Sequence, residues 1–225
     1  MKGKRTLAFS FTLLLSLVIV NYNSIREVIN WHRQEALSEA AWNGDIKRIK
    51  LLLLAGADVN SCVSEGGCPL ITASSGGQTE TVRFLLDKGG NINIRNENGR
   101  TALTDAVYNN HIATVRLLLS RGADVNARAD GYTLLDRASH KGQTEVASLL
   151  LANGAGSNGD SDVALRIAII NHHPEIVKLL LDKGIDVNKE YDSESHSTLP
   201  SALHLAIKSG SPEMIKMLKQ AGAKR

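Results

Sequence analysis

The chain has 225 residues, which is enough for one domain, or for one domain with a tail, and long enough to bury a core. Apolar residues make up 43% of the sequence but aromatic residues only 4%, so the interior must consist of Leu, Ile, Val and Ala, which favours close-packed helices. A net charge of +3 is too small to indicate nucleic-acid binding by itself, and two cysteines exclude a disulfide-rich scaffold.

The first 25 residues have the layout of an export signal. Lys2, Lys4 and Arg5 precede Leu7 to Val20, a run of 14 residues without a charge. This length fits the apolar core of a signal peptide, whereas a helix that spans a membrane needs about 20 residues. We therefore expect residues 1–25 to form a signal peptide or a signal anchor.

Cleavage and retention of this segment both stay open. Large residues follow Val20 where a cleavage site has small ones, so an anchor that extends to Ile25 is the alternative to cleavage. In either case the rest of the chain, which carries the repeats described below, is expected outside the cytoplasm, because the cations keep the amino end inside. It is then either periplasmic or anchored to the membrane. A buried helix of the domain is disfavoured, since the apolar residues occupy every helical face. Residues 26–34 are then expected to be a linker.

A glycine-led pattern of five residues, typified by GADVN, recurs through the rest of the chain. Its copies start at Gly56, Gly89, Gly122, Gly154 and Gly184, with spacings of 33, 33, 32 and 30 residues. A Leu-rich segment with helical spacing precedes each copy. Before it lies a second pattern, seen as CPLITA at 68–73, TALTDA at 101–106, TLLDRA at 133–138, VALRIA at 163–168 and SALHLA at 201–206. These patterns resemble the ankyrin repeat, which opens with T-P-L-H-x-A and has a period of about 33 residues.

The resemblance implies an all-α solenoid of stacked helix pairs with short β-hairpin loops over residues 35–225, with the first and last copies acting as caps. Physical chemistry agrees with this interpretation. Thr101, Thr133 and Ser201 suit the N-caps of the first helices, because their hydroxyls can accept from free backbone N–H groups. Gly77 and Gly142 suit the turns between paired helices.

No motif for catalysis is visible in the sequence. A Walker loop, a nucleophile elbow and His-Glu-x-x-His are all missing, so we predict no catalytic, cofactor-binding or metal-ligating residue. His111 and His173 match the histidine that commonly follows the interhelical turn of ankyrin repeats, which implies a structural role. A metal-dependent enzyme is kept as an alternative class that metal bound after native purification would favour.

Cys62 and Cys68 stand on the two arms of the first hairpin. They are either two unrelated small residues or, in an exported protein, a disulfide that closes a short loop. Such a bridge could contribute about 2 kcal/mol in the chain-entropy model.

Resemblance to ankyrin repeats also implies a binding surface. Proteins of this family generally bind other proteins through a concave groove, which is lined by the hairpin tips and the exposed ends of the first helices. Transferred to this sequence, the expected partner-binding residues are Trp42, Arg100, Tyr108, Tyr132, His140, Lys141 and Ile170. An aromatic or apolar side chain at these positions buries no core, so Trp42, Tyr108, Tyr132 and Ile170 are candidates for an interaction hot spot.

The functional hypothesis is an exported, non-enzymatic ankyrin-repeat module that binds another protein. Within it, an inhibitor or immunity protein and a scaffold for a partner are both open. The alternatives are the metal-dependent enzyme and a eukaryotic intracellular ankyrin adaptor. We expect no cofactor and no nucleic acid, and contact with a membrane only through residues 7–25 if they are retained.

Overall fold

The computed structural model describes residues 26–63, 67–156, 161–188 and 201–224. The described chain is a single stack of helix pairs, as the repeat pattern predicts. Its elements are a helix over residues 26–42, α2 (Ile46–Leu54), α3 (Pro69–Ser75), α4 (Thr79–Asp87), α5 (Ala102–Tyr108), α6 (Ile112–Ser120), β1 (Arg128–Ala129), β2 (Tyr132–Thr133), α7 (Leu134–Lys141), α8 (Thr144–Ala152), α9 (Ser161–Ile170), α10 (Pro174–Asp182), α11 (Ala202–Ser209) and α12 (Pro212–Gln220).

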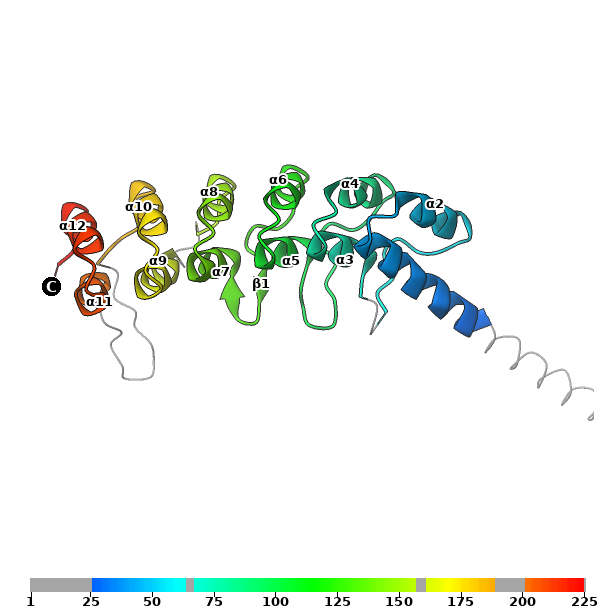
Figure 1. Ribbon diagram of the computed structural model, residues 1–225, viewed down its shortest axis with the longest axis horizontal. Helices are drawn as coiled ribbons and strands as arrows, with labels where there is room; N and C mark the ends of the chain where they lie inside the picture. The colour runs from blue at the N-terminus through cyan, green and yellow to red at the C-terminus, as the bar shows by residue number, and fades with distance from the viewer. Residues whose placement is uncertain (1–25, 64–66, 157–160, 189–200, 225) are drawn as a thin grey trace, which may run out of the picture.

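The helices lie in two rows. Figure 1 shows α3, α5, α7, α9 and α11 along one row and α2, α4, α6, α8, α10 and α12 along the other, with the hairpin that contains β1 projecting from the first row. We call these the inner and outer rows. Helix 26–42 precedes α2 as the inner helix of the first pair. The predicted all-α solenoid is confirmed.

N-cap residues begin three of the inner helices at the positions that the sequence predicts. Thr101 Oγ1 accepts from the Thr104 amide and Thr133 Oγ1 accepts from the Asp136 amide. In return, Thr104 and Asp136 accept from the amides of their N-caps, which completes two capping boxes. Ser201 Oγ accepts from the amide of the third residue of α11. The predicted N-cap roles of these residues are confirmed.

Two kinds of residue form the turns between paired helices. Gly77 and Gly142 have φ angles of +68° and +69°, which glycine adopts without a Cβ penalty. The same turn in other repeats is made by Asn110 and His172, with φ angles of 59° and 58°. Asn and His tolerate this left-handed region better than most residues, so the turn does not depend on glycine alone.

One continuous hydrophobic core runs along the stack between the rows. Large side chains such as Leu103, Leu118 and Leu165 are fully buried, and the inner helices contribute alanines that are 0% exposed at Ala73, Ala106, Ala138, Ala168 and Ala206. The small residues let neighbouring helices approach closely, so the leucines of adjacent repeats fill the space between them.

Asparagines join the loops of successive repeats. Asn60 donates from Nδ2 to the Gly89 carbonyl and accepts from the Asn91 amide at 2.6 Å. Asn93 and Asn188 accept in the same way from the amides of Asp124 and Lys224. These bonds join each of these loops to the loop of the next repeat, in addition to the packing of the core.

Near the amino terminus the structure differs from expectation. Residues 26–34, expected to be a linker, are helical and continuous with the first repeat, because no Gly or Pro interrupts the chain before Gly44. Among the described residues no helix is long and apolar enough to cross a membrane. The expected signal or anchor, residues 1–25, lies outside the described residues.

Candidate protein-binding surface

Each inner helix presents one residue at the equivalent position near its carboxyl end. We call this series the groove row, and its members are Trp42, Ser75, Tyr108, His140, Ile170 and Lys208. Trp42, Tyr108 and Ile170 are exposed, although their size and apolar surface would suit a core. The exposed positions of these three residues agree with the repeat alignment that selected them.

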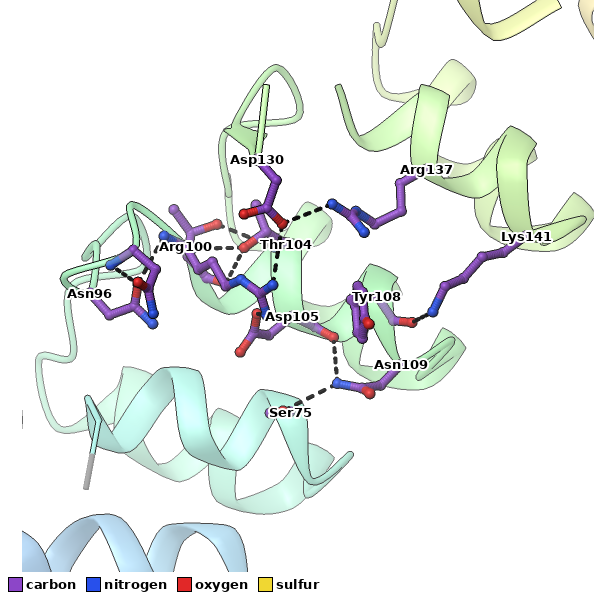
Figure 2. Close-up of polar contacts among 12 residues, drawn as sticks. Ser75, Asn96, Arg100, Thr104, Asp105, Tyr108, Asn109, Asp130, Arg137 and Lys141 are labelled. Atoms are coloured by element: carbon purple, nitrogen blue, oxygen red, sulfur yellow. Dashed lines mark hydrogen bonds and ion pairs between the residues drawn. The ribbon is translucent and has the colours of Figure 1, made fainter. Parts of the chain in front are cut away.

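A cluster of charged groups surrounds Tyr108 at the middle of this row (Figure 2). The Lys141 ammonium lies 3.7 Å from the centre of the Tyr108 ring, and the guanidinium groups of Arg137 and Arg100 lie 5.0 and 5.3 Å from it. Lys141 also donates from Nζ to the Tyr108 carbonyl at 2.9 Å. Three cations therefore hold one aromatic ring that remains 37% exposed.

Local helix geometry brings these cations together. Arg137 and Lys141 are four residues apart on α7, so their side chains lie on one face of that helix, towards Tyr108 at the end of α5. Arg100 directly precedes Thr101, the N-cap of α5, and reaches Tyr108 from the start of the same helix.

Two carboxylates hold the arginines in place. Asp130, at the turn between β1 and β2, accepts from Arg100 at 3.2 Å and from Arg137 at 3.1 Å. Asp105 on α5 lies 3.5 Å from Arg100 Nη1. We define the Tyr108 cluster as Arg100, Asp105, Tyr108, Asp130, Arg137 and Lys141. With three cations and two carboxylates, its formal charge is positive.

Burial raises the pKa of Asp105 above the ordinary value of an aspartate, and the negative charge of Asp130 acts in the same direction. Arg100 and Arg137 lower this pKa, but burial prevails. The geometry agrees, because Asp105 Oδ1 has no hydrogen-bond partner within the described residues although Arg100 is at ion-pair distance. A carboxylate that is buried and incompletely paired costs free energy to ionise.

Asn109, next to Tyr108, connects the cluster to the preceding repeat. Its Nδ2 donates to the Asp105 carbonyl at 3.0 Å and to Ser75 Oγ at 3.1 Å. Both Tyr108 and its neighbour in the sequence therefore contact an adjacent inner helix, which limits motion of the ring.

The sequence-predicted residues divide into two groups. Arg100, Tyr108 and Lys141 meet in the cluster, whereas Trp42, Tyr132, His140 and Ile170 lie outside it. Tyr132 is exposed on β2, at the hairpin, opposite the buried Ala129. Sequence reasoning missed Asp105, Asp130 and Arg137. The four-residue spacing from Arg137 to Lys141 was the available signal, because it places both cations on one helical face.

The two histidines that follow interhelical turns contact the preceding repeat. His111 Nε2 lies 2.9 Å from the Ser75 carbonyl, and His173 Nε2 lies 3.2 Å from the His140 carbonyl. Donation by a ring N–H would satisfy each carbonyl, which agrees with the structural role expected of these residues. In the described part of the chain, no group of three or more His, Cys, Asp or Glu side chains could hold a metal ion.

Cys62 and Cys68 are joined as a disulfide, with their Cα atoms 4.1 Å apart. The bridge closes the first loop beside the Val63–Gly67 backbone pairing. Cys68 is also the N-cap of α3, where it makes no side-chain cap hydrogen bond, and Pro69 follows it in the first turn. A covalent link therefore stands at a helix start that has no capping hydroxyl.

Comparison with known proteins agrees with this architecture. A family model for three copies of the ankyrin repeat matches residues 37–129 and 127–191, and a second model for ankyrin repeats matches residues 165–218. The chain belongs to the ankyrin repeat family. No curated protein matches the sequence significantly.

Solved structures with this fold come from several organisms. The chain is 28% identical to the human ASB11 ankyrin repeat domain, with a TM-score of 0.69 and 84% of each chain covered. It is 27% identical to the ankyrin repeat domain ABAYE2397 from Acinetobacter baumannii AYE, with a TM-score of 0.73, covering 84% of this chain and 98% of that one.

A third similar chain comes from a complex of the predatory endopeptidase Bd0816 of Bdellovibrio bacteriovorus with the immunity protein Bd3460. The identity is 29%, the TM-score is 0.67, and the match covers 82% of this chain and 97% of that one. The repeats define a protein-binding module of the ankyrin class.

Proposed function

We propose that this ankyrin-repeat protein is exported and acts, without catalysis of its own, by binding and inhibiting a partner protein through its groove row. The observation that carries the proposal is the Tyr108 cluster. An exposed aromatic ring is held there by three cations at the centre of a row that buries no core. Such rigid, amphipathic anchors supply most of the free energy of binding at interfaces.

The charges of the cluster indicate the chemistry of the partner surface. Arg100 and Arg137 donate hydrogen bonds to the Asp130 carboxylate, whereas Lys141 donates to the neutral carbonyl of Tyr108. An acidic side chain of the partner would pair with Lys141 while an adjacent apolar group covers the Tyr108 ring. Complementary charge of this kind raises the association rate and suppresses wrong partners.

Export is supported by the amino-terminal sequence, in which Lys2, Lys4 and Arg5 precede the uncharged run Leu7 to Val20. The Cys62–Cys68 disulfide is consistent with an oxidising compartment. Inhibition, in preference to scaffolding, is supported by the likeness to a chain from a complex of an endopeptidase with an immunity protein.

The binding proposal is tested by affinity purification from the source cells with the tagged full chain as bait. A Tyr108→Ala, Lys141→Ala variant should stay folded, with a melting temperature only slightly below the parent's because the lost contacts are on the surface, and should lose at least about tenfold in affinity for the recovered partner, as expected for a central anchor. Arg116→Ala is the matched control, because Arg116 pairs with Glu145 on the outer row, away from the cluster. Equal binding by the double variant and the control would refute the role of the cluster.

Two further measurements separate the remaining parts of the proposal. If the recovered partner is an enzyme or toxin, adding the ankyrin-repeat protein should lower the partner's activity. Unchanged or increased activity would contradict inhibition and favour a scaffold. For export, a reporter active only outside the cytoplasm is fused after Arg225 and should give signal. Activity from a cytoplasmic reporter alone would contradict export.

A further inference from the structure

The inner helices from α3 to α11 expose charges of one sign. Three of these five helices carry a carboxylate, and all three carboxylates are buried, at Asp105, Asp136 and Asp162. The exposed Lys and Arg side chains of the same helices are Lys141 on α7 and Lys208 on α11. The surface that these helices turn to solvent is therefore cationic.

The outer row differs, because it exposes acids as well as bases. Each of α4, α8, α10 and α12 has an exposed glutamate in its first turn, at Glu80, Glu145, Glu175 and Glu213. Glu145 pairs with Arg116 of α6 at 3.1 Å. Charges of both signs therefore offset each other on the outer row, whereas the inner row between α3 and α11 favours an anionic partner.

Apolar and cationic side chains alternate along the carboxyl ends of the inner helices. Tyr108 ends α5, Lys141 ends α7, Ile170 ends α9, and Lys208 lies one residue before the end of α11. All four side chains are exposed. Consecutive members of this set of helices are in contact, and they lie side by side along the inner row (Figure 1). The four side chains therefore form one line across four repeats.

The surface between the two lysines is apolar. Ile170 is 56% exposed, which is more than Tyr108 at 37%. Ile167 precedes Ile170 by three residues on α9, and Leu205 precedes Lys208 by three residues on α11, so each pair shares a helical face. Both Ile167 and Leu205 are half-buried. A ligand that neutralises both lysines must therefore also cover apolar surface between them.

An acidic polypeptide fits this surface better than a nucleic acid does. Binding of a phosphate backbone needs clustered cations that follow the strand. Here Ile170 separates the two lysines, while Arg100 and Arg137 already donate to Asp130. A polypeptide can present carboxylates and apolar side chains in turn, so it meets both requirements of the line.

The distance between repeats determines which spacing the polypeptide needs. Packed helices lie about 8–10 Å apart. An extended chain with three residues per turn rises about 3.1 Å per residue, so every third side chain points the same way about 9 Å further on. In a β-strand, side chains on one face recur after about 7 Å, which would lose register with the repeats. One contact per inner helix therefore requires a period of three residues.

We propose that the line of Tyr108, Lys141, Ile170 and Lys208 binds an extended segment of the partner in which apolar and acidic residues alternate at every third position. The apolar residues cover Tyr108 and Ile170, and the carboxylates pair with Lys141 and Lys208. The inference rests on the proposed function, because Tyr108 and Lys141 belong to both. Ile170 and Lys208 extend recognition by two repeats and select the second half of the segment.

Synthetic peptides test this pattern without the natural partner. The first probe is a fluorescein-labelled peptide of twelve residues with Leu, Glu, Leu and Glu at every third position and Ser and Pro elsewhere. The second probe has the reversed sequence, because either chain direction gives the same spacing. A control peptide has the same composition with these four residues at every second position. Fluorescence anisotropy with the full chain should show that one of the two probes binds at least tenfold more tightly than the control peptide.

Substitutions in the full chain locate the contacts. Lys208→Ala and Ile170→Ala should each weaken binding of the better probe at least threefold. Replacement of the probe's Glu opposite Lys208 by Gln should weaken binding to the parent but not to Lys208→Ala, which isolates this pair. Lys178→Ala is the matched control, since Lys178 is exposed on the outer helix α10, and it should leave binding unchanged. Far-UV circular dichroism checks that each variant keeps the helical content of the parent.

The outcomes separate this inference from the proposed function. If neither probe binds more tightly than the control peptide, or if Lys208→Ala and Ile170→Ala bind the better probe as the parent does, the extended segment is refuted. Tighter binding of a labelled oligothymidylate than of either probe would also overturn it. The proposed function is judged separately, by the loss of affinity of the Tyr108→Ala, Lys141→Ala variant for the partner recovered from cells, and it stands if that loss is found.

Discussion

Substitution of Gly77 tests the packing that aligns the groove row. Gly77 has a φ angle of +68°, and a Cβ added to it would lie 2.7 Å from His111 Nδ1. Gly99 has nearly the same φ, +71°, but a Cβ there would meet nothing within 4 Å. The two positions therefore share the backbone penalty and differ in the contact with the histidine ring.

The expected losses of stability follow from these two contributions. An L-residue in the left-handed region costs about 1–2 kcal/mol, which applies to both Gly77→Ala and Gly99→Ala. At Gly77 the His111 ring must also move, which strains the packing and lengthens its 2.9 Å contact with the Ser75 carbonyl. Overpacking of this kind costs about 1–3 kcal/mol more. The free energy of unfolding of Gly77→Ala should then be lower than that of Gly99→Ala by this overpacking cost.

Urea denaturation followed by far-UV circular dichroism measures both variants, with the slope checked because repeat arrays can lose cooperativity. A double-mutant cycle then isolates the contact. In a His111→Ala background, Gly77→Ala should cost no more than Gly99→Ala. If Gly77→Ala and Gly99→Ala are equally destabilising with His111 present, the packing of this ring against the preceding turn is refuted.

Three other predictions concern single contacts. Burial raises the pKa of Asp105 in the folded chain, so the free energy of unfolding should fall as the pH rises from the pKa of Asp105 in the unfolded chain to its raised pKa in the folded chain. Urea denaturation at several pH values measures this dependence, which Asp105→Asn should weaken; an unchanged pH dependence in the variant would contradict the prediction. Thr101→Ala and Thr133→Ala should each cost about 1 kcal/mol, measured by the same unfolding, because each removes a capping box, whereas no loss would exclude that role. Mass spectrometry of nonreduced protein from an oxidising compartment should show the Cys62–Cys68 bridge, which two free thiols would reject.

Much of the fold could be predicted because the same physical requirement recurs in every repeat. A hydroxyl at Thr101, a small side chain at Ala106 and a left-handed turn at Gly77 each meet a need that the period places at a known position. Residues 26–34 have no equivalent segment in the other copies of the repeat. Their helix follows only from the absence of a breaker before Gly44, so a boundary drawn from the repeat pattern began the domain too late in the chain, at residue 35.

The exposure of the positions in the candidate site could be predicted from the repeat alignment, but the charged residues around Tyr108 could not. Alignment placed Tyr108 and Lys141 on the exposed ends of inner helices, because every copy has those positions. It could not identify Asp105 and Arg137. These two residues occupy the same position of two neighbouring repeats, but in two other copies that position holds Thr72 and Ile167, so the repeat pattern does not call for a charge there. What brings the charges together is the side-chain reach between two particular repeats, which differs from one pair to the next.

This difference between repeats bears on the proposed function. The shared positions build the stack, so they are the same in a repeat that binds and in one that does not. Tyr108 stands out because its neighbours supply Arg100, Arg137 and Lys141 at 5.3, 5.0 and 3.7 Å, whereas other members of the groove row lie outside such a cluster. A ring already held by charged neighbours loses less conformational freedom when a partner covers it, and this favours tight binding. The site of recognition is therefore best sought where the residues at equivalent positions depart furthest from the repeat.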